Sequence, residues 1–254
     1  MNNLIQENVY GHAKRLGWLL SHIPETANTL EFGCGTGFMI TLPIAKLGRS
    51  IIGIDSDRES IRYGQQIFRQ QGFNCDMLKT IDLSEIDALF DAIIVSEVFE
   101  HLSDTTVDSV LEIIKTKLKP GGKILVTVPN GYGWFEVESY IWNELFIGRC
   151  LERTCVVSII SELKQRIFGK DIEPIHPSTL SSSPHIQRFT LKRIQQKLID
   201  HGFNILDVQG SVLFCGQFSN LFFTGINTIM KLNTWIGRKF PRIAAGFYIA
   251  ATGK

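Results

Sequence analysis

Glu97, Glu100 and His101 are close enough in the sequence to act together. If this stretch forms one helical turn, Glu100 and His101 lie three and four residues beyond Glu97, and the three side chains converge on one point. Two carboxylates and an imidazole suit a divalent cation, which would lower the pKa of an acceptor and fix its position. The imidazole could instead act as a base without metal, or simply order the loop, so three interpretations stay open.

A glycine-rich turn provides a second group of functional residues. Gly33, Gly35 and Gly37 follow a short apolar run, and glycine lets a backbone turn tightly and approach a ligand closely. Phe38 stands where the dinucleotide fingerprint G-x-G-x-x-G requires its third glycine, so a pyrophosphate is not the expected ligand. A second predicted strand ends in Asp55, twenty residues after Gly35, where an acid could hold a ribose hydroxyl pair. Together these features favour a nucleoside without phosphates.

These motifs resemble the class I S-adenosylmethionine-dependent methyltransferases, whose first motif reads acid-x-G-x-G-x-G and whose second strand ends in an acid. Residues 90–96 are similar to the fourth strand of that family, and residues 118–128 are similar to its turn into the fifth. The resemblance implies S-adenosyl-L-methionine as the cofactor. It also implies an α/β fold with a doubly wound, mostly parallel seven-stranded sheet, the Rossmann-like methyltransferase fold, in which the last strand is antiparallel.

The resemblance also implies a set of cofactor-binding residues. Glu31 would face the methionyl ammonium, and the ring of adenine would lie near Ile81 and Asp82, although Asp82 could equally be a solvated loop acid. The full set predicted to bind the cofactor is Glu31, Gly33, Cys34, Gly35, Gly37, Asp55, Ser56, Ile81, Asp82 and Ser96. Cys34 has no activating histidine nearby in the sequence, so we interpret it as a small side chain beside the ligand.

The pattern E-x-x-E-H at residues 97–101 is similar to that of the ubiquinone-biosynthesis O-methyltransferases and the small-RNA 2′-O-methyltransferases, in which it is associated with a metal. His185 begins a segment that resembles one common in the family, so we prefer it to His176 among the loop histidines. The predicted catalytic residues are therefore His101, Glu97, Glu100 and His185. Glu97, Glu100 and His101 are the predicted ligands of a divalent metal ion, Mg²⁺ or similar.

Strands alternate with helices through most of the chain, and this alternation predicts a parallel sheet with ligands at the carboxyl ends of its strands. Apolar residues spaced as in a helix predict an N-terminal helix over 7–23, which ends at Pro24. Further helices are expected to begin at Asp57 and at Ser103, and a third strand is expected over 73–77. Strands six and seven are expected over 203–208 and 245–251.

Two long segments interrupt this alternation. Residues 131–185 are too long for a simple connection and are predicted to form a helical lid with a mobile loop over the substrate side. Residues 212–244 form an amphipathic insertion, with Phe218, Phe222, Ile226 and Ile229 on one helical face and four cations behind it. This insertion could cover the substrate cleft or lie on an anionic membrane. We expect a single domain over 1–254.

Composition narrows the function further. The five cysteines form no C-x-x-C pair, which argues against a disulfide framework or a structural zinc site. Net charge is +1 overall, −6 over residues 1–185 and +7 over 186–254, so nucleic acid is an unlikely partner. The amino terminus shows neither a signal peptide nor an anchor, so we expect a cytoplasmic protein. Peripheral contact with the inner face of the membrane is a further hypothesis.

From these observations we predict an O-methyltransferase that acts on a small-molecule or lipid-linked acceptor. An RNA-end 2′-O-methyltransferase and a non-catalytic cofactor-binding subunit of a partner enzyme are the alternatives.

Overall fold

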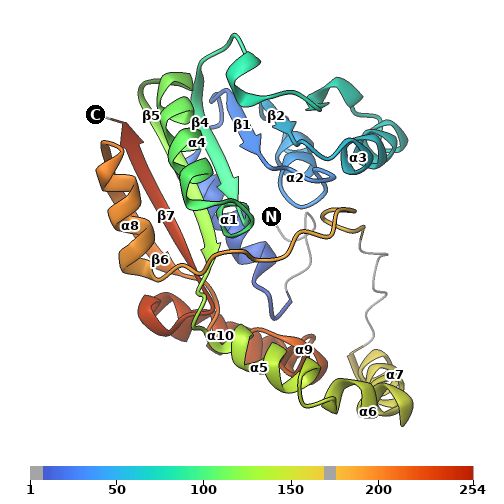
Figure 1. The fold of residues 1–254 in the computed structure, drawn as a ribbon. Helices are drawn as coiled ribbons and strands as arrows, with labels where there is room; N and C mark the ends of the chain where they lie inside the picture. Colours follow the sequence, from blue (N-terminus) through green and yellow to red (C-terminus); the bar gives the residue numbers. More distant parts are fainter. Residues whose placement is uncertain (1–7, 169–175, 254) are drawn as a thin grey trace.

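The computed structural model describes residues 8–168 and 176–253 (Figure 1). Within them, seven strands form one sheet in the order β3-β2-β1-β4-β5-β7-β6. The strands are β1 (Thr29–Phe32), β2 (Ile51–Ile54), β3 (Leu78–Lys79), β4 (Phe90–Ser96), β5 (Leu118–Pro129), β6 (Phe203–Gly210) and β7 (Gly246–Gly253). Strand β7 is antiparallel to both β5 and β6, whereas the pairs among β1 to β5 are parallel. The predicted sheet and its antiparallel last strand are confirmed.

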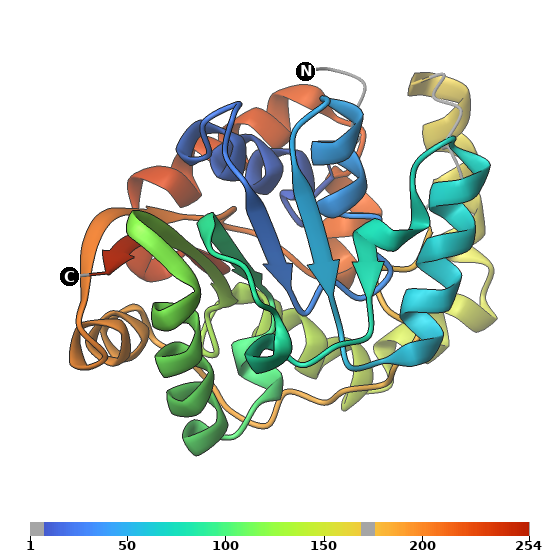
Figure 2. The same ribbon diagram turned by 90° about the horizontal axis from the view of Figure 1, so that it is seen from above.

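Helices cover both faces of the sheet because successive strand residues point to opposite sides. In β4, Ile93 and Val95 lie in the same core cluster as the buried residues of α4 (Asp104–Lys117) and α8 (Leu191–Asp200). Ala92 and Ile94 lie instead in a cluster with residues of α1 (His12–His22) and α2 (Thr41–Lys46). Figure 2, turned by 90° from the view of Figure 1, shows helices on both sides of the sheet. Strand β4 is therefore apolar on both sides, as a central parallel strand must be.

Two helices begin at the predicted capping residues. Asp57 caps α3 (Arg58–Gln70) by accepting from the N–H of Glu59 at 3.1 Å, and Ser103 caps α4 by accepting from the N–H of Thr106 at 3.1 Å. The N-terminal helix, expected from residue 7, begins later because Gly11 takes a left-handed conformation with φ 71°. Residue 7, the first of that predicted helix, lies outside the described residues.

The third strand lies further along the chain than predicted. Residues Cys75–Met77 form a short 3₁₀ helix, η1, and the strand is limited to Leu78 and Lys79. The side chain of Asn74 accepts from the N–H of Asp76 at 2.9 Å, which stabilises a turn where the apolar pattern suggested an extended chain. The expectation of a strand over 73–77 was wrong for this reason.

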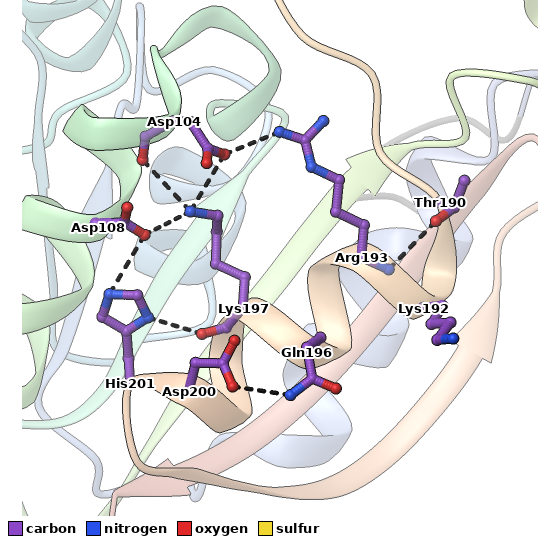
Figure 3. A pocket seen from close by; sticks show the side chains of 9 residues that line it. All are labelled: Asp104, Asp108, Thr190, Lys192, Arg193, Gln196, Lys197, Asp200 and His201. Carbon is purple, nitrogen blue, oxygen red and sulfur yellow. Dashed lines mark hydrogen bonds and ion pairs between the residues drawn. The ribbon is translucent and has the colours of Figure 1, made fainter.

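A cluster of charged side chains holds α8 against α4 (Figure 3). The ammonium of Lys197 lies 2.5 Å from a carboxylate oxygen of Asp108 and 3.2 Å from one of Asp104. Arg193 donates to Asp104 at 2.9 Å, and His201 lies 3.3 Å from Asp108. These residues line a surface depression, but they are engaged with one another and none of them is a predicted site residue.

The first insertion is helical, as expected. It contains α5 (Trp134–Asn143), α6 (Ile147–Arg153) and α7 (Val156–Phe168), and residues 169–175 lie outside the described part. The chain then returns in an extended segment, residues 176–190, which we call the strap. Figure 1 shows α5, α9 and α10 beyond the carboxyl ends of the parallel strands, with the strap crossing the same edge. The role of the helices as a lid stays a prediction.

The second insertion forms two helices rather than one. Helix α9 (Gln217–Phe223) ends at Thr224, and α10 (Asn227–Lys239) begins after Gly225, which has φ 97°. The predicted continuous face through Phe218, Phe222, Ile226 and Ile229 is therefore wrong, because the left-handed glycine changes the chain direction in its middle. Among the described residues, no helix has the length and apolar character needed to span a bilayer.

Candidate active site

The glycine-rich turn joins β1 to α2 at the carboxyl edge of the sheet. The N–H groups of Gly33 and Cys34 donate to the carbonyl oxygen of Ile54 at 2.9 and 3.0 Å, so the turn is tied to the end of β2. Gly35 has φ 55°, and a Cβ atom there would lie 2.1 Å from the carbonyl oxygen of Ser178 in the strap. Glycine is required at this position by both the backbone conformation and the space. The N–H of Gly37 completes the turn by donating to the carbonyl oxygen of Cys34 at 2.8 Å.

Asp55 lies directly against this turn. One of its carboxylate oxygens accepts from the N–H of Gly35 at 2.7 Å, and the other accepts from the N–H of Asp57 at 2.8 Å. The next residue, Ser56, is exposed in the bend after β2. The end of β2 therefore presents a carboxylate beside the turn, where a ribose held by that turn would meet it.

Glu31 is buried below the turn, with only 4% of its surface exposed. Burial raises the pKa of its carboxyl group to about 8, against the opposing effects of a hydrogen bond from Thr41 and the charge of Arg15. Cys34 is also buried, and burial together with the nearby carboxylates raises the pKa of its thiol well above the ordinary value. A neutral thiol is a poor nucleophile, which agrees with its interpretation as a small side chain beside the ligand.

Ile81 and Asp82 follow β3, next to β2 at the sheet edge. Ile81 is half-buried and packs against the main core cluster. Asp82 is exposed, and one of its oxygens accepts from the N–H and the hydroxyl of Ser84 at 2.8 and 2.5 Å, which caps the short helix η2 (Leu83–Glu85). Those bonds lower the pKa of Asp82. Its capping role accounts for the acid here, and adenine binding by Asp82 stays a prediction.

Ser96, Thr127 and Glu97 form a chain of hydrogen bonds across the ends of β4 and β5. The hydroxyl oxygens of Ser96 and Thr127 are 2.8 Å apart, and Thr127 donates to a carboxylate oxygen of Glu97 at 2.8 Å. A guanidinium nitrogen of Arg15, on α1, lies 3.5 Å from the same oxygen. Glu97 has φ 55°, outside the helical region, so it does not share a helical turn with Glu100 and His101 as the sequence suggested.

Glu100 and His101 instead meet His185. The two belong to a short 3₁₀ helix, η3 (Phe99–His101), and the ring centroids of His101 and His185 are 4.9 Å apart. One potential ligand atom from each of Glu100, His101 and His185 lies within 4.8 Å of the others. Among the described residues this set converges, whereas Glu97 is engaged with Thr127 and Arg15.

The electrostatics of this cluster are unusual. Glu100 is 1% exposed, and its Oε2 atom has no hydrogen-bond partner. Burial, followed by the charge of Glu97, raises the pKa of its carboxyl group well above the ordinary value. His185 is only partly shielded, yet desolvation and the neighbouring His101 lower its pKa. A buried carboxyl group without a partner is costly unless a proton or another group satisfies it.

The strap connects the two halves of the site. At its start, the carbonyl oxygen of Ser178 accepts from the N–H of Thr36 at 2.9 Å, beside the glycine turn. At its end, the side-chain amide of Gln187 donates to the carbonyl oxygens of Phe99 and Leu102 at 3.0 and 2.6 Å. The strap therefore roofs the glycine turn and brings His185 to His101.

Sequence reasoning missed the contribution of α1 and of the two insertions to this edge. The residues overlooked are Tyr10, Arg15, Glu138 and Cys215. Burial raises the pKa of Tyr10 to about 12, with smaller contributions from Cys215 and Glu138. Burial likewise raises the pKa of Cys215 to about 12, with Glu97 and Glu138 contributing. The sequence offered no signal that singled out Arg15, which has Lys14 beside it in α1, and only the fold shows that Arg15 faces Glu97.

Comparison of the sequence with known proteins identifies a family and several relatives. A sequence model described as a methyltransferase domain matches residues 6–208. A mitochondrial ubiquinone biosynthesis O-methyltransferase from Rattus norvegicus is 32% identical over 127 residues, which are 47% of this chain and 35% of that protein. A ubiquinone biosynthesis O-methyltransferase from Brucella anthropi is 33% identical over 103 residues, which are 40% of each chain. The matches thus span well under half of these relatives.

Solved structures agree on the fold. A SAM-dependent methyltransferase from Methanosarcina mazei superposes with a TM-score of 0.55 at 20% identity and covers 93% of this chain and 96% of its own. A glycopeptide N-methyltransferase complexed with sinefungin gives a TM-score of 0.57 at 13% identity, over 96% and 94%. These similarities concern the fold alone. The comparisons favour neither an RNA-end 2′-O-methyltransferase nor a non-catalytic subunit.

Proposed function

The chain belongs to the methyltransferase-domain family, and on that premise we propose that it transfers a methyl group from S-adenosyl-L-methionine to an oxygen of a small-molecule or lipid-linked acceptor. One observation carries the proposal most directly. The glycine turn with Asp55 and the Glu100, His101 and His185 cluster follow neighbouring strands at the same sheet edge, under one strap. A nucleoside site and a proton-accepting site would then lie side by side.

On the cofactor side, two carboxylates beside the glycine turn would bind S-adenosyl-L-methionine. The cofactor supplies a methyl group on a positively charged sulfur, which is already activated for transfer. Asp55 is held by two backbone N–H groups, so its outward lone pairs can accept from ribose hydroxyls without rearrangement. Glu31 lies under the same turn and, once ionised, would pair with the methionyl ammonium.

On the acceptor side, His101 is the base in this proposal. Its Nδ1 atom lies 3.2 Å from the carbonyl oxygen of Pro184, which can only accept a hydrogen bond. The neutral imidazole is therefore assigned its proton on Nδ1, which leaves the Nε2 lone pair free to take the hydroxyl proton of the acceptor. Loss of that proton makes the oxygen nucleophilic as it displaces the methyl group from sulfur.

The same residues fit a divalent metal ion, which remains part of the proposal. The unpartnered Oε2 of buried Glu100 is the kind of atom a cation would satisfy, and one carboxylate with two imidazoles is a known ligand set for such ions. Glu100, His101 and His185 would hold the ion, which would lower the pKa of the acceptor hydroxyl. Imidazole ligands favour zinc or iron over Mg²⁺ and Mn²⁺, which prefer oxygen. In this set His185 replaces Glu97 among the predicted ligands.

Three substitutions test the proposed catalytic residues. Glu97→Ala, Glu100→Ala and His101→Ala should each remove most turnover of labelled S-adenosyl-L-methionine with acceptor extracts, while cofactor affinity stays nearly unchanged. Asp200→Ala, in the remote α8 cluster, is the matched control and should keep full turnover. Turnover retained in His101→Ala would overturn its role as base.

Chelation followed by metal add-back separates the two mechanisms. The metal proposal expects turnover to fall with chelator and to return with zinc or iron more than with Mg²⁺. Turnover that is insensitive to chelator, with no divalent ion copurifying, would exclude the metal and leave His101 as a base without metal.

A further inference from the structure

Helix α10 has an exposed face that is both apolar and basic. Leu232 and Trp235 are each 55% exposed, and with Lys231, Arg238 and Lys239 they recur at intervals of three and four residues, so they share one side of the helix. Directly after the helix, Phe240 and Ile243 are 48% and 55% exposed, and Arg242 is exposed between them. We call these eight residues the α10 surface.

This face cannot be turned inward, because the opposite side of α10 is fixed to the protein. The side-chain oxygen of Asn233 accepts from the N–H groups of Leu213 and Phe214 at 3.1 and 2.7 Å, and its amide donates to the carbonyl of Phe214 at 2.9 Å. Gly237 lies so close to the backbone that a Cβ atom there would be 2.1 Å from the carbonyl oxygen of Ser211. The exposed residues are thus presented by a rigid helix.

The charge of the α10 surface has a single sign. None of the 47 residues after Asp207 is acidic, and all four cations of the surface are exposed. The ammonium of Lys239 lies 5.0 Å from the ring centre of Trp235 and 5.9 Å from that of Phe240, so cations and aromatic rings are interleaved. A second copy of this chain is a poor partner, because a symmetric contact would bring the same cations together.

We propose that the α10 surface binds an anionic phospholipid membrane, with Leu232, Trp235, Phe240 and Ile243 entering the interface and the four cations contacting lipid headgroups. Tryptophan and phenylalanine beside lysine and arginine are typical of helices that lie in the plane of a bilayer. This surface differs from the face predicted from the sequence, since α10 turns Met230 inward and Leu232 and Trp235 outward. The proposal does not depend on methyl transfer.

Cosedimentation with vesicles tests the proposal without any turnover. The full chain should sediment with phosphatidylcholine vesicles that contain phosphatidylglycerol at low salt, bind them more weakly at high salt, and bind pure phosphatidylcholine poorly. Arg238→Gln combined with Lys239→Gln should weaken binding by about twenty-five-fold, since each cation near an anionic surface contributes about fivefold. Leu232→Ser combined with Trp235→Ser should reduce binding to the background.

Matched substitutions elsewhere control for lost charge and lost apolar area. Leu89→Ser removes a leucine that is 48% exposed in the loop before β4, and Lys46→Gln removes an exposed cation at the end of α2. Both variants should bind vesicles as the wild type does, and all variants should keep the wild-type affinity for S-adenosyl-L-methionine. A wild-type protein that stays in the supernatant at low salt, or α10 variants that bind like the controls, would overturn the proposal and leave the surface to a protein partner.

Discussion

Glu31 should make cofactor binding depend on pH. Its carboxyl group is buried under the glycine turn, and burial raises its pKa to about 8, so at pH 7 only about one molecule in eleven carries the charge. The cofactor ammonium stays charged over pH 6 to 7, because α-amino groups titrate near pH 8 or above. Binding should therefore favour the ionised form of Glu31 and release its proton.

The magnitude follows from the same pKa. Because a pKa of about 8 leaves the group protonated below pH 8, the dissociation constant should fall about ninefold from pH 6 to pH 7 as ionisation becomes easier. The cost of ionising the group at pH 7 is about 1.4 kcal/mol. About 0.9 proton should leave for each cofactor bound at pH 7, since that fraction of the free protein is protonated.

Isothermal titration calorimetry in buffers of different ionisation enthalpy measures both quantities. Glu31→Gln keeps the shape of the side chain without its charge, and it should bind more weakly at pH 7, with little pH dependence and little proton release. Glu25→Gln, at an exposed carboxylate, is the matched control and should behave like the wild type. Equal proton release in the wild type and Glu31→Gln would refute the reasoning.

Three further substitutions test the cofactor site, the strap and the core. Asp55→Ala should weaken S-adenosyl-L-methionine binding by about 1 to 3 kcal/mol in calorimetry, whereas Asp82→Ala should change it much less because Ser84 engages that carboxylate; tighter binding of NAD would contradict the cofactor assignment. Gln187→Ala should lower kcat by up to about a hundredfold with little change in cofactor affinity, since it removes the two side-chain hydrogen bonds of Gln187 that hold the strap to Phe99 and Leu102, and kcat equal to that of a Gln196→Ala control would argue against this positioning role. Leu198→Ala, in the core under α8, should reduce the free energy of unfolding by about 2 to 5 kcal/mol in urea titration, and a loss below 1 kcal/mol would be inconsistent with its burial.

The sheet and the glycine turn could be predicted because their signals are local. A run such as residues 90–96 can only be a central strand if both faces are apolar, and glycines at 33, 35 and 37 permit the positive φ angles of a tight turn whatever surrounds them. The capping residues Asp57 and Ser103 act within three residues of their own position, so they too were visible in the sequence.

The acceptor side was harder to predict because its geometry comes from distant segments. Glu97 seemed to belong to one helical turn with Glu100, but its left-handed backbone directs it to Thr127 and Arg15. His185 reaches His101 only because the strap is bound to η3 across more than eighty residues of sequence. The apolar pattern of the second insertion did not reveal the break at Gly225, since glycine is compatible with both a helix and a turn.

The most direct test of the account is the fate of the methyl group itself. The protein should be incubated with S-adenosyl-L-methionine labelled at its methyl carbon, together with separate water-soluble and lipid-soluble extracts as acceptor pools. The account predicts one S-adenosylhomocysteine for each labelled product, with the methyl carbon bonded to oxygen in the magnetic resonance spectrum of that product. A labelled methyl group on nitrogen or carbon, or bound cofactor without any turnover in either pool, would contradict it.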